Sequence, residues 1–142
     1  MELEIRDFEV KNLEAEGAHI YLKAKVEING IQQSIEVFFR DLSQEKKIFN
    51  EATMLIEGDL IEADGGTSLL NTQVKSVKLD VELPLDQMSI KDRLYATGLI
   101  HEFRKVYRRD KIRAREILKA LGLSEEYAEE ILLSRKFILP FD

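Results

Sequence analysis

The sequence contains no cysteine, and it has only two prolines, two histidines and no tryptophan. Without cysteine, disulfides, thiolate nucleophiles and cysteine-ligated zinc sites are excluded, and a reducing cytoplasm is the expected location. Histidine is the most versatile general base and metal ligand at neutral pH. Because His19 and His101 stand alone, we interpret each as a surface residue and not as a base or a ligand.

Long apolar runs are also missing, so the sequence predicts no membrane span. The first four residues alternate between apolar and acidic side chains, which is not the pattern of a signal peptide. Hydrophobic residues make up 44% of the 142 residues and charged residues 34%, a globular composition. We therefore expect a soluble cytoplasmic protein without membrane association.

Catalytic motifs are absent as well. The sequence matches neither a P-loop nor a nucleophile elbow, and Gly65-Gly66 is too short to cradle a phosphate. The carboxylates near the turns are interpreted as solvated. The expectation is therefore a protein without cofactor or metal that is not an enzyme.

Charge divides the chain into two parts. Residues 1–88 carry 9 Lys and Arg against 18 Asp and Glu, whereas residues 89–142 carry 12 against 9. We interpret residues 1–86 as an acidic β domain and residues 87–142 as a basic helical segment. Such a split indicates that the two parts attract each other or that the basic part faces an anionic partner.

The strongest local pattern is a β-hairpin. Apolar and polar residues alternate strictly over residues 19–28, and Asn29-Gly30 supplies the two positive-φ positions of a type I′ turn. A two-residue turn sets the register of the two strands. It places Ile28 opposite Ile31, Val26 opposite Gln33, Ala24 opposite Ile35, Leu22 opposite Val37 and Ile20 opposite Phe39.

The other elements follow from periodicity and from capping residues. A phase change near Arg6-Asp7 predicts a bulge in a curved first strand, and Pro84 ends the last strand. Ser89 and Asp110 are expected helix caps. Strands are predicted at about residues 2–12, 18–28, 31–40, 53–63 and 68–83, a short helix at about 43–52, and longer helices at about 90–107, 110–121 and 124–135. An apolar tail, 137–141, is expected to fold back onto the body.

Five strands with a helix between the third and fourth resemble the oligonucleotide/oligosaccharide-binding (OB) fold. The stretch ATMLIEGDLIEADGGTSLLNTQVKSVKL is similar to the fourth and fifth strands of bacterial single-stranded DNA-binding proteins, with a central glycine and a glycine-containing turn. The resemblance covers under a third of the chain. The predicted fold is α+β: a five-stranded antiparallel sheet or small OB-like barrel, followed by a three-helix segment packed on it.

The resemblance implies a binding face on the outside of the second and third strands. The hairpin register places Tyr21 opposite Phe38 on that face, near Lys23, Lys25 and Arg40. Paired aromatic rings beside cations could stack with unpaired bases. The alternative is that the helical segment or a second subunit covers the two rings.

A second candidate is a basic cluster around residues 104–115. It could bind nucleic acid or an acidic partner, or it could be a solvated helix junction that complements the acidic domain. Its members are Arg104, Lys105, Arg108, Arg109, Lys111, Arg113 and Arg115.

The last two predicted helices allow two further comparisons. As a helix-turn-helix, the last helix would bring four glutamates to the phosphates, which disfavours DNA binding. The stretch is similar to the three-helix ubiquitin-associated domain, with Leu121-Gly122-Leu123 in place of its Met-Gly-Phe signature and with Ala128 matching. From this similarity we expect only a compact packing of three helices.

These observations favour a non-catalytic binding or adaptor protein that acts through protein–protein contacts or self-association. The alternative is a single-stranded nucleic-acid-binding protein that uses the OB-like face and the basic cluster.

Overall fold

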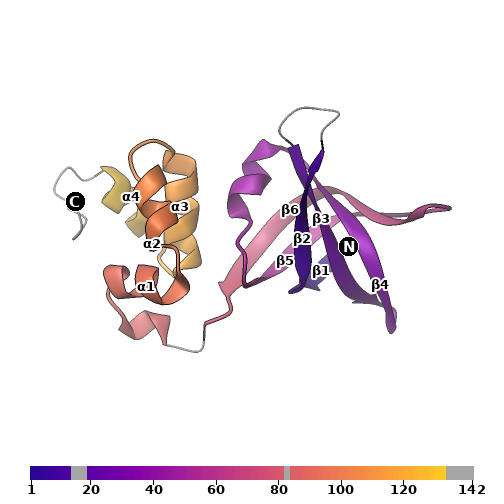
Figure 1. Ribbon diagram of the computed structural model, residues 1–142, viewed down its shortest axis with the longest axis horizontal. Coiled ribbons are helices and arrows are strands. Elements are labelled where there is room, and N and C mark those ends of the chain that lie inside the picture. Colours follow the sequence, from indigo (N-terminus) through magenta and orange to yellow (C-terminus); the bar gives the residue numbers. More distant parts are fainter. Residues whose placement is uncertain (14–18, 82–83, 134–142) are drawn as a thin grey trace. The chain divides into compact units, whose positions relative to one another are not determined.

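The computed structural model describes residues 1–13, 19–81 and 84–133, in two compact units. The first unit, Met1–Lys78, holds the β-sheet, and the second, Leu79–Asp142, holds the α-helices (Figure 1). The α+β class predicted from the sequence is therefore confirmed. Within the described ranges, no helix has the length and apolar character needed to cross a bilayer.

The sheet has six strands and is mixed, which corrects the prediction of five antiparallel strands. Their order is β1-β5-β6-β4-β3-β2. The β4 and β6 strands run parallel, with Ile35 opposite Thr67 and Val37 opposite Leu69. Pattern alone did not reveal this pairing, because a parallel pair joins strands that are distant in sequence. The strands are β1 (Glu2–Ile5), β2 (Phe8–Leu13), β3 (His19–Ile28), β4 (Ile31–Phe39), β5 (Ala52–Ala63) and β6 (Gly66–Leu79).

The predicted first strand is two strands on opposite edges of the sheet. Strand β1 pairs with β5, placing Leu3 opposite Ile56, whereas β2 pairs with β3, placing Phe8 opposite Ala24. The phase change at Arg6-Asp7 is therefore the point where the chain passes from one edge to the other. Hydrogen bonds join β1 and β2 to these different neighbours, so the predicted barrel does not close.

The predicted hairpin is confirmed. Strands β3 and β4 pair in the expected register from Tyr21–Phe38 to Ile28–Ile31. At the turn, Asn29 and Gly30 have φ angles of 53° and 80°, the left-handed conformation that a type I′ turn requires. The inner face of the sheet forms the core of this unit. Its fully buried members include Ile5, Leu22, Ile35, Val37, Met54, Ile56 and Leu69.

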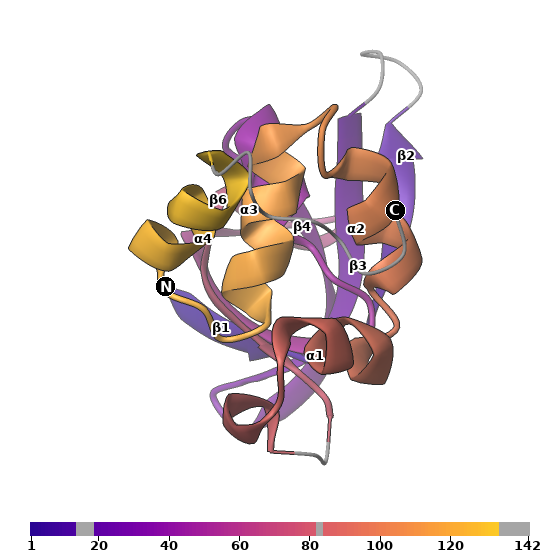
Figure 2. The same ribbon diagram turned by 90° about the vertical axis from the view of Figure 1, so that its left-hand side faces the viewer.

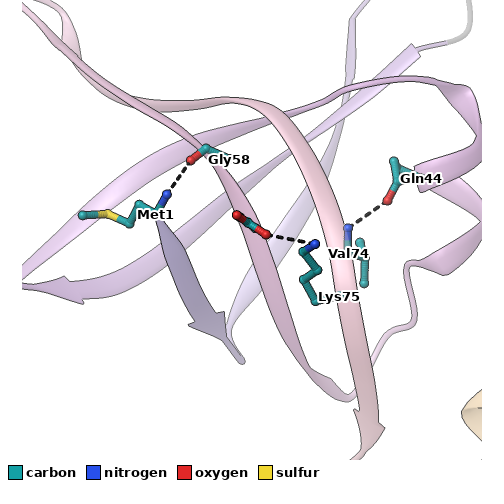
Figure 3. Close-up of polar contacts among 6 residues, drawn as sticks. Met1, Gln44, Gly58, Val74 and Lys75 are labelled. Carbon is teal, nitrogen blue, oxygen red and sulfur yellow. Dashed lines mark hydrogen bonds and ion pairs between the residues drawn. The ribbon is translucent and has the colours of Figure 1, made fainter.

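A short 3₁₀-helix, η2 (Leu42–Lys47), follows β4 where the sequence predicted a helix at about residues 43–52. The Asp41 carboxylate caps it by accepting a hydrogen bond from the Ser43 backbone N–H at 3.0 Å. The buried Gln44 carbonyl accepts the Val74 N–H at 2.8 Å and so ties η2 to β6 (Figure 3). Because Val74 lies in β6, the side chain of Gln44 accepts a backbone hydrogen bond that a neighbouring strand would otherwise accept.

The predicted helix at about residues 90–107 is two helices, α1 (Ile90–Thr97) and α2 (Ile100–Val106). Gly98 has a φ of 74°, and the Leu99 N–H bonds back to the Leu94 carbonyl at 3.0 Å. This left-handed glycine cap ends α1 and reverses the chain. The apolar stripe continued through Gly98, which is why the periodicity indicated one helix.

The helical unit also contains the 3₁₀-helix η3 (Leu85–Gln87), α3 (Lys111–Ala120) and α4 (Glu125–Leu133). Asp110 caps α3, as predicted, by accepting the Arg113 N–H at 3.1 Å. Helix α3 contacts both α2 and α4, as Figure 2 shows, and Phe103 and Leu118 are fully buried among them. The Arg93 side chain adds a link by donating to the Leu121 carbonyl at 3.0 Å. The predicted tail 137–141 lies outside the described residues, as do the ends of the predicted 68–83 strand and 124–135 helix.

Candidate functional site

Two aromatic rings form the centre of the outer face of the β3–β4 hairpin. Tyr21 and Phe38 are cross-strand neighbours, and their rings stack with centroids 5.2 Å apart and planes 17° apart. Both side chains are half-buried. The sequence predicted this pair, because a two-residue turn places alternate residues of the two strands opposite each other on one face.

The charged residues around the rings come in opposite signs. Lys23 lies between two carboxylates, with Glu9 opposite on β2 and Glu36 opposite on β4. Lys11, opposite Tyr21, forms an ion pair with Glu9 at 3.0 Å. The hydrogen bond from Lys11, supported by its charge, lowers the pKa of Glu9 below its ordinary value. The face is therefore a mixed-charge surface around an aromatic pair.

The remaining two predicted face residues, Lys25 and Arg40, are exposed. Lys25 lies opposite Ser34, so no carboxylate faces it directly across the β3–β4 ladder. The Arg40 backbone N–H donates to the Thr72 carbonyl at 3.0 Å, and this bond holds the end of β4 against β6. These two side chains can meet an acceptor on a binding partner.

Beside Arg40 the surface opens into a polar hollow of about 490 Å3. Two pairs of polar side chains in its lining contact each other. The Lys75 ammonium lies 3.0 Å from the Glu57 carboxylate, and the Asn71 amide donates to Asp59 at 3.3 Å (Figure 3 shows the Lys75 pair). The lining residues are Met1, Arg40, Glu57, Gly58, Asp59, Asn71, Gln73 and Lys75.

The sequence did not predict this hollow. Its lining comes from the N-terminal residue, the end of β4, and the middles of β5 and β6, and only the sheet order brings these segments together. Within β6, Asn71 has a φ of 54°, an irregularity that the sequence pattern did not predict. This irregularity sits beside Thr72, which is opposite Phe39 at the register shift between β4 and β6.

The predicted basic cluster belongs to the helical unit, and part of it holds that unit together. Arg113 donates to Glu102 on α2 at 2.8 Å with its side chain only 13% exposed, and Arg115 donates to Glu129 on α4 at 2.9 Å. Each pair joins α3 to a neighbouring helix. These two arginines are therefore packing residues, and the sequence pattern overstated the charge available to a partner.

The rest of the cluster is exposed around Tyr107. The Arg108 guanidinium and the Lys111 ammonium lie 5.9 and 5.7 Å from the centre of the buried Tyr107 ring, within the range of cation–π attraction. Lys111 also donates to the Leu132 carbonyl at 3.2 Å. Arg104, Lys105 and Arg109 are exposed along the same stretch.

In the part of the chain that the structure describes, no three acidic or histidine side chains gather as a metal site would require. The hollow and the aromatic pair present paired charges and ring faces, which can bind a partner's side chains. Comparisons of the chain with protein-family models, with curated proteins and with solved structures found no match.

Proposed function

We propose that the chain is a non-catalytic binding protein whose β3–β4 face docks a protein partner. The observation that carries the proposal is the stacked Tyr21–Phe38 pair, half-buried within a surface of alternating charges. Tyrosine and arginine are enriched at the energetic centres of protein interfaces, and Arg40 lies two residues beyond Phe38, just past the end of β4. A partner would place an apolar side chain against the rings and a carboxylate near Arg40.

The balance of charges favours a protein over a phosphate backbone. A nucleic-acid surface needs several cations that are not already neutralised, because counterion release supplies much of the affinity. Here Lys11 is paired with Glu9, Lys23 lies between two carboxylates, and Lys75 is paired with Glu57. Lys25 and Arg40, the other two predicted face cations, also lie near carboxylates, those of Glu9 and Asp41.

A second candidate function is supported by the topology. The sheet is open, yet η2 follows β4 as a helix follows the third strand in the OB fold that the sequence resembles. In that arrangement, the Tyr21–Phe38 face would bind single-stranded nucleic acid by base stacking. For this function, base stacking on the two rings must supply the affinity for nucleic acid that the paired lysines do not contribute.

The proposal is tested by affinity capture with the full chain as bait. We expect partner proteins that remain bound after nuclease treatment and that are lost with the Tyr21→Ser/Phe38→Ser variant, since losing both rings weakens binding by about thirtyfold or more. The matched control is Ile31→Ser, which changes a residue that is 65% exposed at the turn of the same hairpin. Capture that is equal with all three baits contradicts a role for this face.

The two candidates separate in a titration with labelled single-stranded oligonucleotides. Low salt favours phosphate contacts, so binding there that falls steeply as salt rises would establish the nucleic-acid function. No binding at low salt excludes that function. Turnover in a broad hydrolase screen would overturn both candidates.

A further inference from the structure

Strand β2 ends the sheet and leaves one side of its backbone without a strand neighbour. It pairs with β3, and among the described residues no other strand pairs with it. An open edge of this kind is a template for adding a strand.

The register shows which backbone groups face outward. The Asp7 carbonyl accepts the Lys25 N–H at 3.4 Å, so Asp7 belongs to the set of residues whose backbone groups point toward β3. Residues alternate along an antiparallel strand, so Glu9 and Lys11 also belong to that set. The N–H and carbonyl groups of Phe8, Val10 and Asn12 therefore point away from β3.

One apolar side chain on this edge is left uncovered. Val10 lies opposite Leu22, which is fully buried, yet Val10 is 45% exposed. Its side chain is on the same face of the sheet as the core, and only its position at the edge exposes it. An added strand would cover it.

We propose that the β2 edge pairs with the β2 edge of a second copy of this chain. The two strands are antiparallel about a twofold axis that passes between the two Val10 residues. Val10 then forms a hydrogen-bonded pair with Val10 of the second copy, and Phe8 does so with Asn12 of the second copy. The Phe8–Asn12 pair occurs twice because of the twofold axis, so about three hydrogen-bonded pairs with two bonds each give about six backbone hydrogen bonds. The two Val10 side chains cover each other.

The charges on β2 select a second copy in this one register. Glu9 lies opposite Lys11 of the second copy, and Lys11 lies opposite its Glu9. These are the closely spaced, non-hydrogen-bonded pairs, in which side chains interact most strongly. A shift by two residues in one direction places the two Lys11 residues opposite each other, and a shift in the other direction does the same for the two Glu9 residues. Both alternatives are repulsive.

The existing Glu9–Lys11 ion pair does not oppose this arrangement. The two side chains are 74% and 42% exposed, so the pair is a solvated contact that gains little. Edge charges normally discourage strand addition, but here they are self-complementary. Lys11 lies opposite Tyr21 and so borders the proposed docking face as well. Val10→Pro leaves Glu9 and Lys11 unchanged, so this variant tests the dimer separately from partner docking.

The test uses a pair of charge variants of the full chain, Lys11→Glu and Glu9→Lys. Each variant alone brings like charges together at two places, and we expect its dimer dissociation constant to rise by about thirtyfold relative to the unmodified chain. Mixed in equal amounts, the two variants restore both attractive pairs and should form a heterodimer. Sedimentation velocity over a range of concentrations measures all three samples.

Val10→Pro provides an independent variant. Proline removes an N–H that points to the open edge and leaves the β2–β3 ladder bonds in place, so we expect a folded monomer. Circular dichroism checks that each variant is folded, and recovery of a dimer in the mixture shows the same for the charge variants. The proposal is overturned if the unmodified chain stays monomeric at about 100 μM. It is equally overturned if a dimer forms that neither Val10→Pro nor the charge variants weaken.

Discussion

Gly58 is the position where a single methyl group should do the most damage to the sheet unit. A Cβ added there would lie 2.8 Å from the Leu70 carbonyl oxygen, 2.8 Å from the Thr72 hydroxyl and 2.9 Å from the Leu69 side chain. All three distances are shorter than real Cβ contacts, and one of the atoms belongs to the backbone. Strand β5 can accept the methyl group only if it moves away from β6.

The cost follows from two effects. Overpacking a tight site typically costs about 1–3 kcal/mol. The buried Thr72 hydroxyl donates to the Leu69 carbonyl at 3.2 Å, and displacing it adds about 1 kcal/mol. We therefore expect Gly58→Ala to lower the free energy of unfolding of the sheet unit by about 2–4 kcal/mol. For a unit of this size, the midpoint of thermal unfolding should fall by about 10–20 °C.

Urea titration followed by far-UV circular dichroism measures this effect. The matched control is Gly65→Ala, in the turn between β5 and β6, where an added Cβ meets nothing within 4 Å. That variant should match the unmodified chain or gain up to about 1 kcal/mol, because alanine restricts the unfolded chain. Ordinary surface substitutions change the free energy of unfolding by up to about 0.5 kcal/mol. If the free energies of unfolding of both variants stay within about that value of the unmodified chain, the close approach of β5 to β6 is refuted.

Two further predictions concern η2 and its cap. Gln44→Ala leaves the buried Val74 N–H without its acceptor and should lower the free energy of unfolding, measured by urea titration, by about 1–3 kcal/mol. Gln44→Glu keeps an acceptor and should lower it less. Equal losses in the two variants would contradict the hydrogen bond. The Ser43 side-chain hydrogen bond lowers the pKa of Asp41, so its stabilising effect is complete above the ordinary aspartate pKa and is lost as pH falls through the lowered pKa. Carboxyl titration by NMR should show this low pKa, and Ser43→Ala should raise it; an unchanged pKa in the variant would show that the cap acts differently.

The part of the fold that was predictable from the sequence is the part that local chemistry determines. Asn29-Gly30 has one favoured hairpin turn, and the strict alternation over residues 19–28 together with Ile31, Ile35 and Val37 leaves a single register. Because register fixes which side chains share a face, the Tyr21–Phe38 pair followed from the sequence. Asp110 was predicted as a cap for a similar reason, since its side chain bonds within one turn.

The features that the sequence did not predict depend on contacts between distant segments or on a residue with two possible roles. The apolar stripe passed through Gly98, and only its φ of 74° shows that it caps α1. Nothing local indicates that Arg113 is held by Glu102, because the pairing depends on how α2 and α3 pack. The polar hollow beside Arg40 depends likewise on the order of strands in the sheet. Such features need the tertiary arrangement.

The division of the first strand at Arg6-Asp7 has a consequence for the order of folding. Contacts within the β3–β4 hairpin close a loop of two residues, whereas the Met1 nitrogen bonds a carbonyl 57 positions away at Gly58 (Figure 3). Closing the longer loop costs more chain entropy and comes later. Strand β2 can therefore pair early with β3, whereas β1 is expected to join last, after β5 is in place. During synthesis, this stretch must wait for more than fifty following residues before it finds its partner.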